Sequence, residues 1–171
     1  MRLSLLVKLV VPLVIVAGLA GYFVTQHFQT RSDAKFTALS LAGTAREYRT
    51  EAASLRLAPG WKWPSAPVPS VASDGRGMRY QRGWGIQAAD FFWYCSWSSR
   101  VLDPRVAASG RRKALAQVLS IRTKYFFKTA LAPNTKPVFD QVLRKAARGD
   151  VRSLRRNYAL NCPKQASGGT S

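Results

Sequence analysis

The sequence predicts a mainly α protein in which an N-terminal transmembrane helix precedes a small helical domain. Three observations support this prediction: an uncharged apolar run near the N-terminus, apolar residues that recur at three- and four-residue steps beyond it, and prolines and glycines that concentrate between such segments. Of the 171 residues, 47% are hydrophobic, which is enough for one packed core. We therefore expect a single folded domain after the apolar segment.

Residues 9–25 are the predicted transmembrane anchor, and residues 1–8 form a short cytoplasmic segment before it. The apolar run extended over residues 3–24 has 22 residues, interrupted only by a serine and Lys8. At about 1.5 Å per residue it covers roughly 33 Å, which matches the hydrocarbon core if Lys8 reaches the headgroups. A cleaved signal peptide is the competing interpretation, because residues 18–20 (Gly-Leu-Ala) have the form of a cleavage site.

Both interpretations export the domain. Arg2 and Lys8 precede the apolar run and Arg31 and Lys35 follow it, so the positive-inside comparison is nearly balanced. We expect the N-terminus in the cytoplasm, since a signal-like start with a translocated domain is the commoner arrangement for this layout. The sequence thus predicts a single-pass cell-membrane protein with an extracytoplasmic domain.

Residues 26–57 are predicted to form a juxtamembrane amphipathic helix. The residues that carry its apolar repeat are Phe36, Leu39, Ala42, Ala45, Tyr48, Ala52 and Leu55. Thr44 and Glu47 have the spacing of a capping box, which predicts that the helix breaks and restarts there. The segment would serve as a stalk, as a dimer seam, or as an ordinary helix packed on its own domain.

Residues 58–77 are predicted to be a loop or linker, because they hold four prolines and three glycines. We expect at least one of Trp61 and Trp63 to pack against the domain. A proline-rich ligand for a partner's groove is a weaker interpretation of residues 64–67.

Residues 78–164 are predicted to form a basic helical domain, and residues 165–171 a disordered tail. Residues 77–85 allow a short β element or an irregular turn. The segment that starts at Ile86 is apolar on nearly all sides, which is typical of a central helix. Further helices are predicted over residues 104–131, 137–148 and 151–160.

Cys95 and Cys162 are the only cysteines, and in an exported chain they predict one disulfide. The bridge would tie the central helix to the C-terminal end of the domain. Two buried free thiols are the alternative, favoured if the domain is cytoplasmic. Because no Cys-x-x-Cys motif is present, the sequence supports neither redox catalysis nor a zinc site.

Positive charge dominates the chain, with a formal net charge of +19. Between Arg100 and Lys164, sixteen basic residues face three acidic ones. Six of the basic residues recur at helical steps and are predicted to form an anion-binding stripe: Arg144, Lys145, Arg148, Arg152, Arg155 and Arg156. Such a stripe can bind phosphates or anionic headgroups, or it can simply be a solvated face.

The sequence offers no catalytic, metal or cofactor site that stands above background. His27, the single histidine, lies beside the anchor, which excludes the usual nucleophile-histidine systems from the domain. Asp90 is the one acid inside the apolar central segment, and its burial would require an arginine or backbone donors. A small enzyme that uses Asp90 is the least favoured hypothesis.

The leading hypothesis is a non-enzymatic, membrane-anchored extracytoplasmic domain. It would bind an anionic lipid or envelope polymer, or act as an accessory subunit of a complex with a membrane protein partner. The alternative is a membrane-tethered cytoplasmic module that binds nucleic acid through the stripe.

Overall fold

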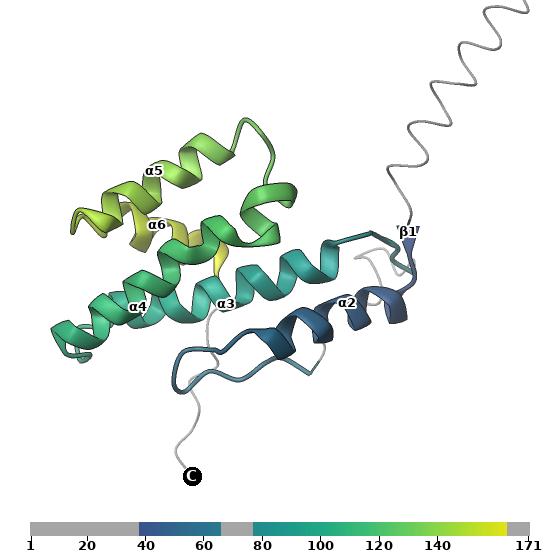
Figure 1. Ribbon diagram of the computed structural model, residues 1–171, viewed down its shortest axis with the longest axis horizontal. Helices are drawn as coiled ribbons and strands as arrows, with labels where there is room; N and C mark the ends of the chain where they lie inside the picture. The colour runs from purple at the N-terminus through teal and green to yellow at the C-terminus, as the bar shows by residue number, and fades with distance from the viewer. Residues whose placement is uncertain (1–37, 66–76, 164–171) are drawn as a thin grey trace, which may run out of the picture. The chain divides into compact units, whose positions relative to one another are not determined.

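The computed structural model describes residues 38–65 and 77–163, and these residues form a mainly helical structure (Figure 1). The fold class predicted from the sequence is confirmed for this part of the chain. The predicted anchor (9–25), the first part of the juxtamembrane segment and the tail (165–171) lie outside the described residues. Among the helices in the described ranges, none has both the length and the apolarity needed to cross a bilayer.

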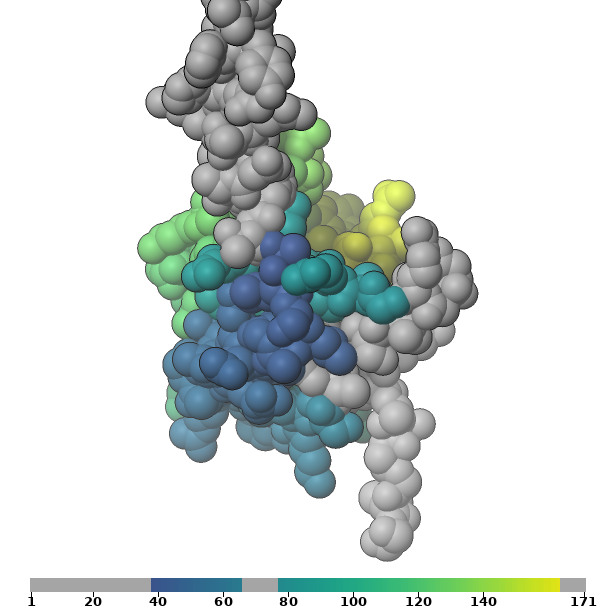
Figure 2. All heavy atoms as spheres, turned by 90° about the vertical axis from the view of Figure 1, so that its right-hand side faces the viewer, coloured from purple at the N-terminus to yellow at the C-terminus, as the bar shows by residue number. Residues whose placement is uncertain are grey.

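The first described helix, α2, runs over Leu41–Ser54. It begins at Ser40, whose Oγ accepts a hydrogen bond from the backbone N–H of Gly43 at 3.2 Å. The predicted restart at Thr44 is wrong, because Thr44 lies buried within the first turns of a continuous helix. Figure 2 shows the outward side chains of α2, in blue, on the surface of the molecule.

The central helix, α3, spans Trp84–Leu102 and packs against α2, α4 and α6. It contributes the largest share of the core, with Ala89, Trp93, Tyr94, Cys95 and Val101 all buried. In Figure 1, α2 lies on one side of α3 and α4, α5 and α6 lie on the other. A helix covered on all sides needs apolar residues all round, so the central position predicted from the sequence is confirmed.

Helices α2 and α3 run parallel to each other. The Glu47 carboxylate accepts hydrogen bonds from Gly83 N at 2.9 Å and Gly85 N at 3.3 Å. Further along, the carbonyl of Arg56 accepts hydrogen bonds from the indoles of Trp93 and Trp97, each at 3.0 Å. When two neighbouring helices run parallel, the segment that joins them must lead back from the end of the first helix to the start of the second. This explains the long Pro/Gly-rich segment between α2 and α3.

The described part of that connection packs against α3. Trp61 lies 5.3 Å from Phe92, ring centre to ring centre, and Trp63 lies 5.4 Å from Phe92 and 5.6 Å from Tyr48. The expectation that at least one tryptophan packs against the domain is therefore met by both. Farther along, β2 (Tyr80–Gln81) pairs with β1 (Ala38–Leu39) in a two-stranded antiparallel sheet, so the short β element allowed by the sequence is present.

The single helix predicted over residues 104–131 is wrong. Helix α4 spans Ala108–Ser120, the 3₁₀ turn η1 spans Ile121–Thr123, and the π-helical turn η2 spans Phe126–Ala130. Lys124 between them has an extended backbone, with φ −86° and ψ 159°. The break frees the N–H of Phe126, which donates a hydrogen bond to the Asp90 carboxylate at 2.9 Å.

Helices α5 (Lys136–Ala147) and α6 (Arg152–Asn161) agree with the predicted ranges to within one residue at each end. Phe139 of α5 packs on Tyr94 at 5.2 Å and on Phe126 at 5.5 Å, ring centre to ring centre. Leu143, Ala146 and Leu154 complete this side of the core. Gly149, at φ 88°, turns the chain between the two helices in a conformation that favours glycine.

Candidate functional site

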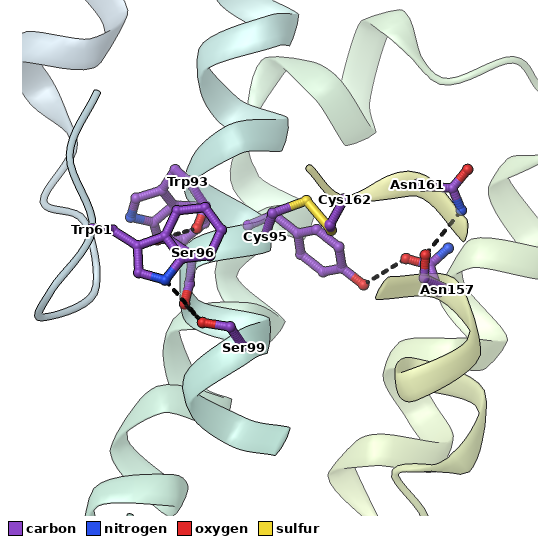
Figure 3. Close-up of a disulfide and its surroundings, with 9 residues drawn as sticks. Trp61, Trp93, Cys95, Ser96, Ser99, Asn157, Asn161 and Cys162 are labelled. Atoms are coloured by element: carbon purple, nitrogen blue, oxygen red, sulfur yellow. Dashed lines mark hydrogen bonds between the residues drawn. A yellow bond between two sulfur atoms is a disulfide. The ribbon is translucent and has the colours of Figure 1, made fainter. Parts of the chain in front are cut away.

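The predicted disulfide is present and joins α3 to the residue that follows α6. Cys95 and Cys162 are bonded, with their Cα atoms 5.6 Å apart and a sequence separation of 67 (Figure 3). Cys95 is fully buried. Next to the bridge, the Tyr94 hydroxyl hydrogen-bonds the Asn157 side chain at 3.1 Å. Such a bond persists in an oxidising compartment, so it indicates an extracytoplasmic location for the domain.

The six residues of the predicted stripe lie at the end of α5 and along α6. Arg144 and Lys145 are in the last turn of α5 and Arg148 is its C-cap, while the other three are on α6. All are exposed except Lys145, which is half-buried. Arg144 pairs with Asp140, and Arg152 pairs with Asp150 at 2.9 Å. These two cations are partly neutralised, whereas the other four form no ion pair within the described residues.

Two consecutive residues of the stripe, Arg155 and Arg156, lie on different surfaces in the structure. Consecutive residues on an α-helix point about 100° apart. Arg156 lines a shallow groove that also includes Val138 and Leu160, whose side chains are 62% and 73% exposed. Arg155 lines a different hollow, beside α3. Arg155 and Arg156 therefore belong to two different surfaces of α6.

The hollow that contains Arg155 has a volume of about 520 Å³. It lies between the loop around Trp61, the C-terminal end of α3, the following loop, and α6. We call it the arginine hollow. Its polar and aromatic lining residues are Trp61, Ser99, Arg100, Asp103, Arg105, Arg155 and Tyr158. Sequence reasoning did not identify it, because its walls come from segments that are far apart in the chain.

Hydrogen bonds fix the walls of the arginine hollow. Ser99 Oγ accepts from the Trp61 indole at 3.0 Å and donates to the Ser96 carbonyl at 2.7 Å (Figure 3). The Arg105 guanidinium holds both oxygens of the Asp103 carboxylate at 3.0 Å, and it lowers the pKa of Asp103. Arg111 donates to the Val106 carbonyl at 2.6 Å and braces the same loop.

A second hollow, mostly apolar and about 490 Å³ in volume, lies along the N-terminal half of α3, and we call it the aromatic hollow. Aromatic residues dominate its lining, which includes Trp84, Phe91, Phe92, Phe126 and Phe139. Asn157 and Asn161 of α6 provide polar groups. The consecutive aromatic residues in the sequence were the available signal for this hollow, but they also fit a plain core.

Asp90 is fully buried. The sequence predicted either an arginine or backbone donors as its partner, and the structure shows a backbone donor. One oxygen accepts from Phe126 N, and the other has no hydrogen-bond partner. The pKa of Asp90 is raised from 3.8 to about 6, mainly by burial; Phe126 N and Lys124 lower it, and the neighbouring Glu51 also raises it. A carboxyl group closed off in this way has a structural role at the break between η1 and η2.

Asp90→Asn is expected to change how stability depends on pH. Because the folded pKa of about 6 exceeds the ordinary value of 3.8, the folded state holds the extra proton between these values. The wild-type free energy of unfolding should therefore fall as pH rises from about 4 to about 6. The amide lacks this titration, so the variant should gain about 2 kcal/mol relative to wild type between pH 4 and pH 8. Urea unfolding of both proteins at several pH values measures this difference. If the free energy of unfolding depends on pH in the same way in both, the expectation is contradicted.

In the described ranges, no group of three or more histidine, cysteine, aspartate or glutamate side chains is arranged to hold a metal ion. The guanidinium groups of the arginine hollow can bind anions, and the aromatic hollow can bind apolar groups. No family model, curated protein or solved structure matches this chain.

Proposed function

We propose that this protein is a membrane-anchored extracytoplasmic domain that binds anionic lipid or envelope polymer through its basic surface. The observation that carries the proposal is the excess of unpaired arginines at the ends of α3 and α5 and on α6. Arg100, Arg148, Arg155 and Arg156 form no ion pair within the described ranges, so their charge is available to an external anion.

The surroundings of Arg156 favour a lipid surface over a polymer in solution. Val138 and Leu160 are the large hydrophobic residues most exposed in the described structure, and both line the groove that contains Arg156. Apolar side chains next to arginines suit the boundary between headgroups and acyl chains. The anchor predicted over residues 9–25 would keep the domain close to the membrane.

The disulfide weakens the alternative of a cytoplasmic nucleic-acid-binding module. A bridge between Cys95 and Cys162 does not persist in the reducing cytosol. A role as an accessory subunit remains compatible with the same surface, since a membrane partner with an acidic face would use the same arginines.

Removal of Arg148 and Arg156 is expected to weaken binding to anionic vesicles. Full-length R148Q/R156Q should bind phosphatidylglycerol vesicles about thirtyfold more weakly than wild type at low salt, because each of the two basic residues near such a surface contributes about 1 kcal/mol. High salt should reduce the difference. Vesicle flotation measures the binding. Vesicles of neutral lipid are the control for binding that comes from insertion of the apolar segment alone.

R46Q/R49Q is the matched control, because Arg46 and Arg49 are two exposed arginines on α2. It should bind anionic vesicles about as well as wild type. Equal losses from both pairs would show that only net charge matters. Wild-type protein that does not distinguish anionic from neutral vesicles would refute the proposed function.

A further inference from the structure

We infer that the arginine hollow is a discrete binding site for a phosphate-bearing ligand of about the size of a sugar phosphate. This inference deepens the proposed function and rests on it. A basic surface attracts any polyanion, whereas the hollow has a fixed shape and a defined set of donors. Its volume of about 520 Å³ falls in the range of small-molecule sites.

The charges in the hollow favour an anion. Three guanidinium groups line it, against the one carboxylate of Asp103. Both oxygens of that carboxylate are bound by Arg105, and one of them also accepts from Arg105 N at 2.9 Å. Arg100 and Arg155 form no ion pair within the described ranges, so two guanidinium groups are left for a ligand.

Guanidinium groups are well suited to bind phosphate. The planar fork of arginine matches two phosphate oxygens at once, and such charge-assisted bonds are about twice as strong as neutral ones. Arg100 comes from the last turn of α3 and Arg155 from α6. A phosphate between them would be held from two separate elements, which gives it a defined position.

The rest of the hollow has room for an organic group. Trp61 and Tyr158 are half-buried aromatic residues in its wall, and the apolar face of such a ring suits the C–H groups of a sugar or glycerol. Trp61 is already held by Ser99 and by Phe92, so it loses little freedom when a ligand binds. Inorganic phosphate alone would leave these contacts unused.

Arg155 and Arg156 provide a matched pair for the test. Both are exposed arginines without an ion pair in the described structure, and both substitutions remove one charge from α6. Arg155 lines the arginine hollow, and Arg156 lines the groove on the other side of the helix. If ligand affinity depends only on net charge, R155Q and R156Q should weaken it equally. If the arginine hollow is a discrete site, only R155Q should weaken it.

The experiment is calorimetric titration of the full-length protein, in neutral detergent, with inorganic phosphate, glycerol phosphate and glucose phosphate. We expect one site per chain, at which the two organic phosphates bind more tightly than inorganic phosphate. R155Q and R100Q should each weaken the organic phosphates about tenfold, which corresponds to the loss of one charge-assisted hydrogen bond. R156Q should bind them within about twofold of wild type. The preferred organic phosphate distinguishes a glycerol-based from a sugar-based source.

Two results would overturn the inference. Equal weakening by R155Q and R156Q would show a diffuse basic surface, and it would leave the proposed function intact if anionic vesicles still bind. Equal affinity for inorganic and organic phosphates would show that the aromatic wall plays no part. Thermal unfolding of each variant establishes that it is folded. If the wild-type protein does not bind anionic vesicles, the proposed function fails, whatever the result for the hollow.

Discussion

Replacement of both cysteines by alanine, in C95A/C162A, is expected to lower the free energy of unfolding by about 4 kcal/mol. The bridge closes a loop of 67 residues, and the entropy that this closure removes from the unfolded chain corresponds to about that amount. Since a small domain is stable by roughly 5–15 kcal/mol, the loss is a large share of the total. Urea unfolding of both proteins measures the effect.

The loss should be localised at first to the C-terminal part of the domain. Cys162 follows α6 directly, and the Tyr94–Asn157 hydrogen bond is another contact between this helix and α3. Hydrogen exchange of the α6 amides should therefore increase more than that of α2. Chemical reduction of the wild type is the matched control and should reproduce the variant. Unchanged stability in both would contradict the structural role of the bridge.

Gly85→Ala is expected to destabilise the domain by about 3 kcal/mol. A Cβ at this position would meet the Thr44 carbonyl, and it would lie 2.7 Å from Tyr48 N and 2.8 Å from Glu47 Cβ. Because backbone atoms are involved, α2 and α3 would have to move apart, which disturbs the hydrogen bonds from Gly83 and Gly85 to Glu47. Thermal and urea unfolding measure the change.

Gly43→Ala is the control for this substitution. Gly43 also lies in a helix, but its added Cβ would be 3.5 Å from Leu39 Cβ and Ser40 Oγ, which is ordinary contact. Alanine favours a helix over glycine by up to about 1 kcal/mol, so the control should be neutral or slightly stabilising. If both variants lose the same stability, the close approach of α2 and α3 at Gly85 is not what makes that position sensitive.

The parts of the fold that local sequence determines were predicted well. Helices α5 and α6 carry regular apolar repeats with Pro137 and Gly149 at their boundaries, and periodicity located them closely. The aromatic segment around Trp93 predicted a central helix because only a helix covered on all sides can be apolar on all sides. The disulfide followed from two cysteines in a chain predicted to be exported.

The parts that depend on distant contacts could not be predicted. The helix after Pro104 breaks at Lys124, where Phe126 N binds the buried Asp90 carboxylate, and no local pattern signals this pairing. Periodicity also cannot reveal that α2 and α3 run parallel. The arginine hollow also depends on distant contacts, since Trp61 comes from the returning connection and Arg155 from α6. Spacing in the sequence grouped Arg155 with Arg156, although the fold directs them to different surfaces.

The disulfide indicates that this domain lies outside the cytoplasm, and cysteine accessibility in intact cells tests this location most directly. Cells are treated with a membrane-impermeant thiol reagent before and after a membrane-impermeant reductant. We expect no labelling before reduction and labelling of Cys162 afterwards, since it is the less buried of the two cysteines and C162A would remove the signal. Labelling that appears only after lysis, without any reductant, would contradict the account.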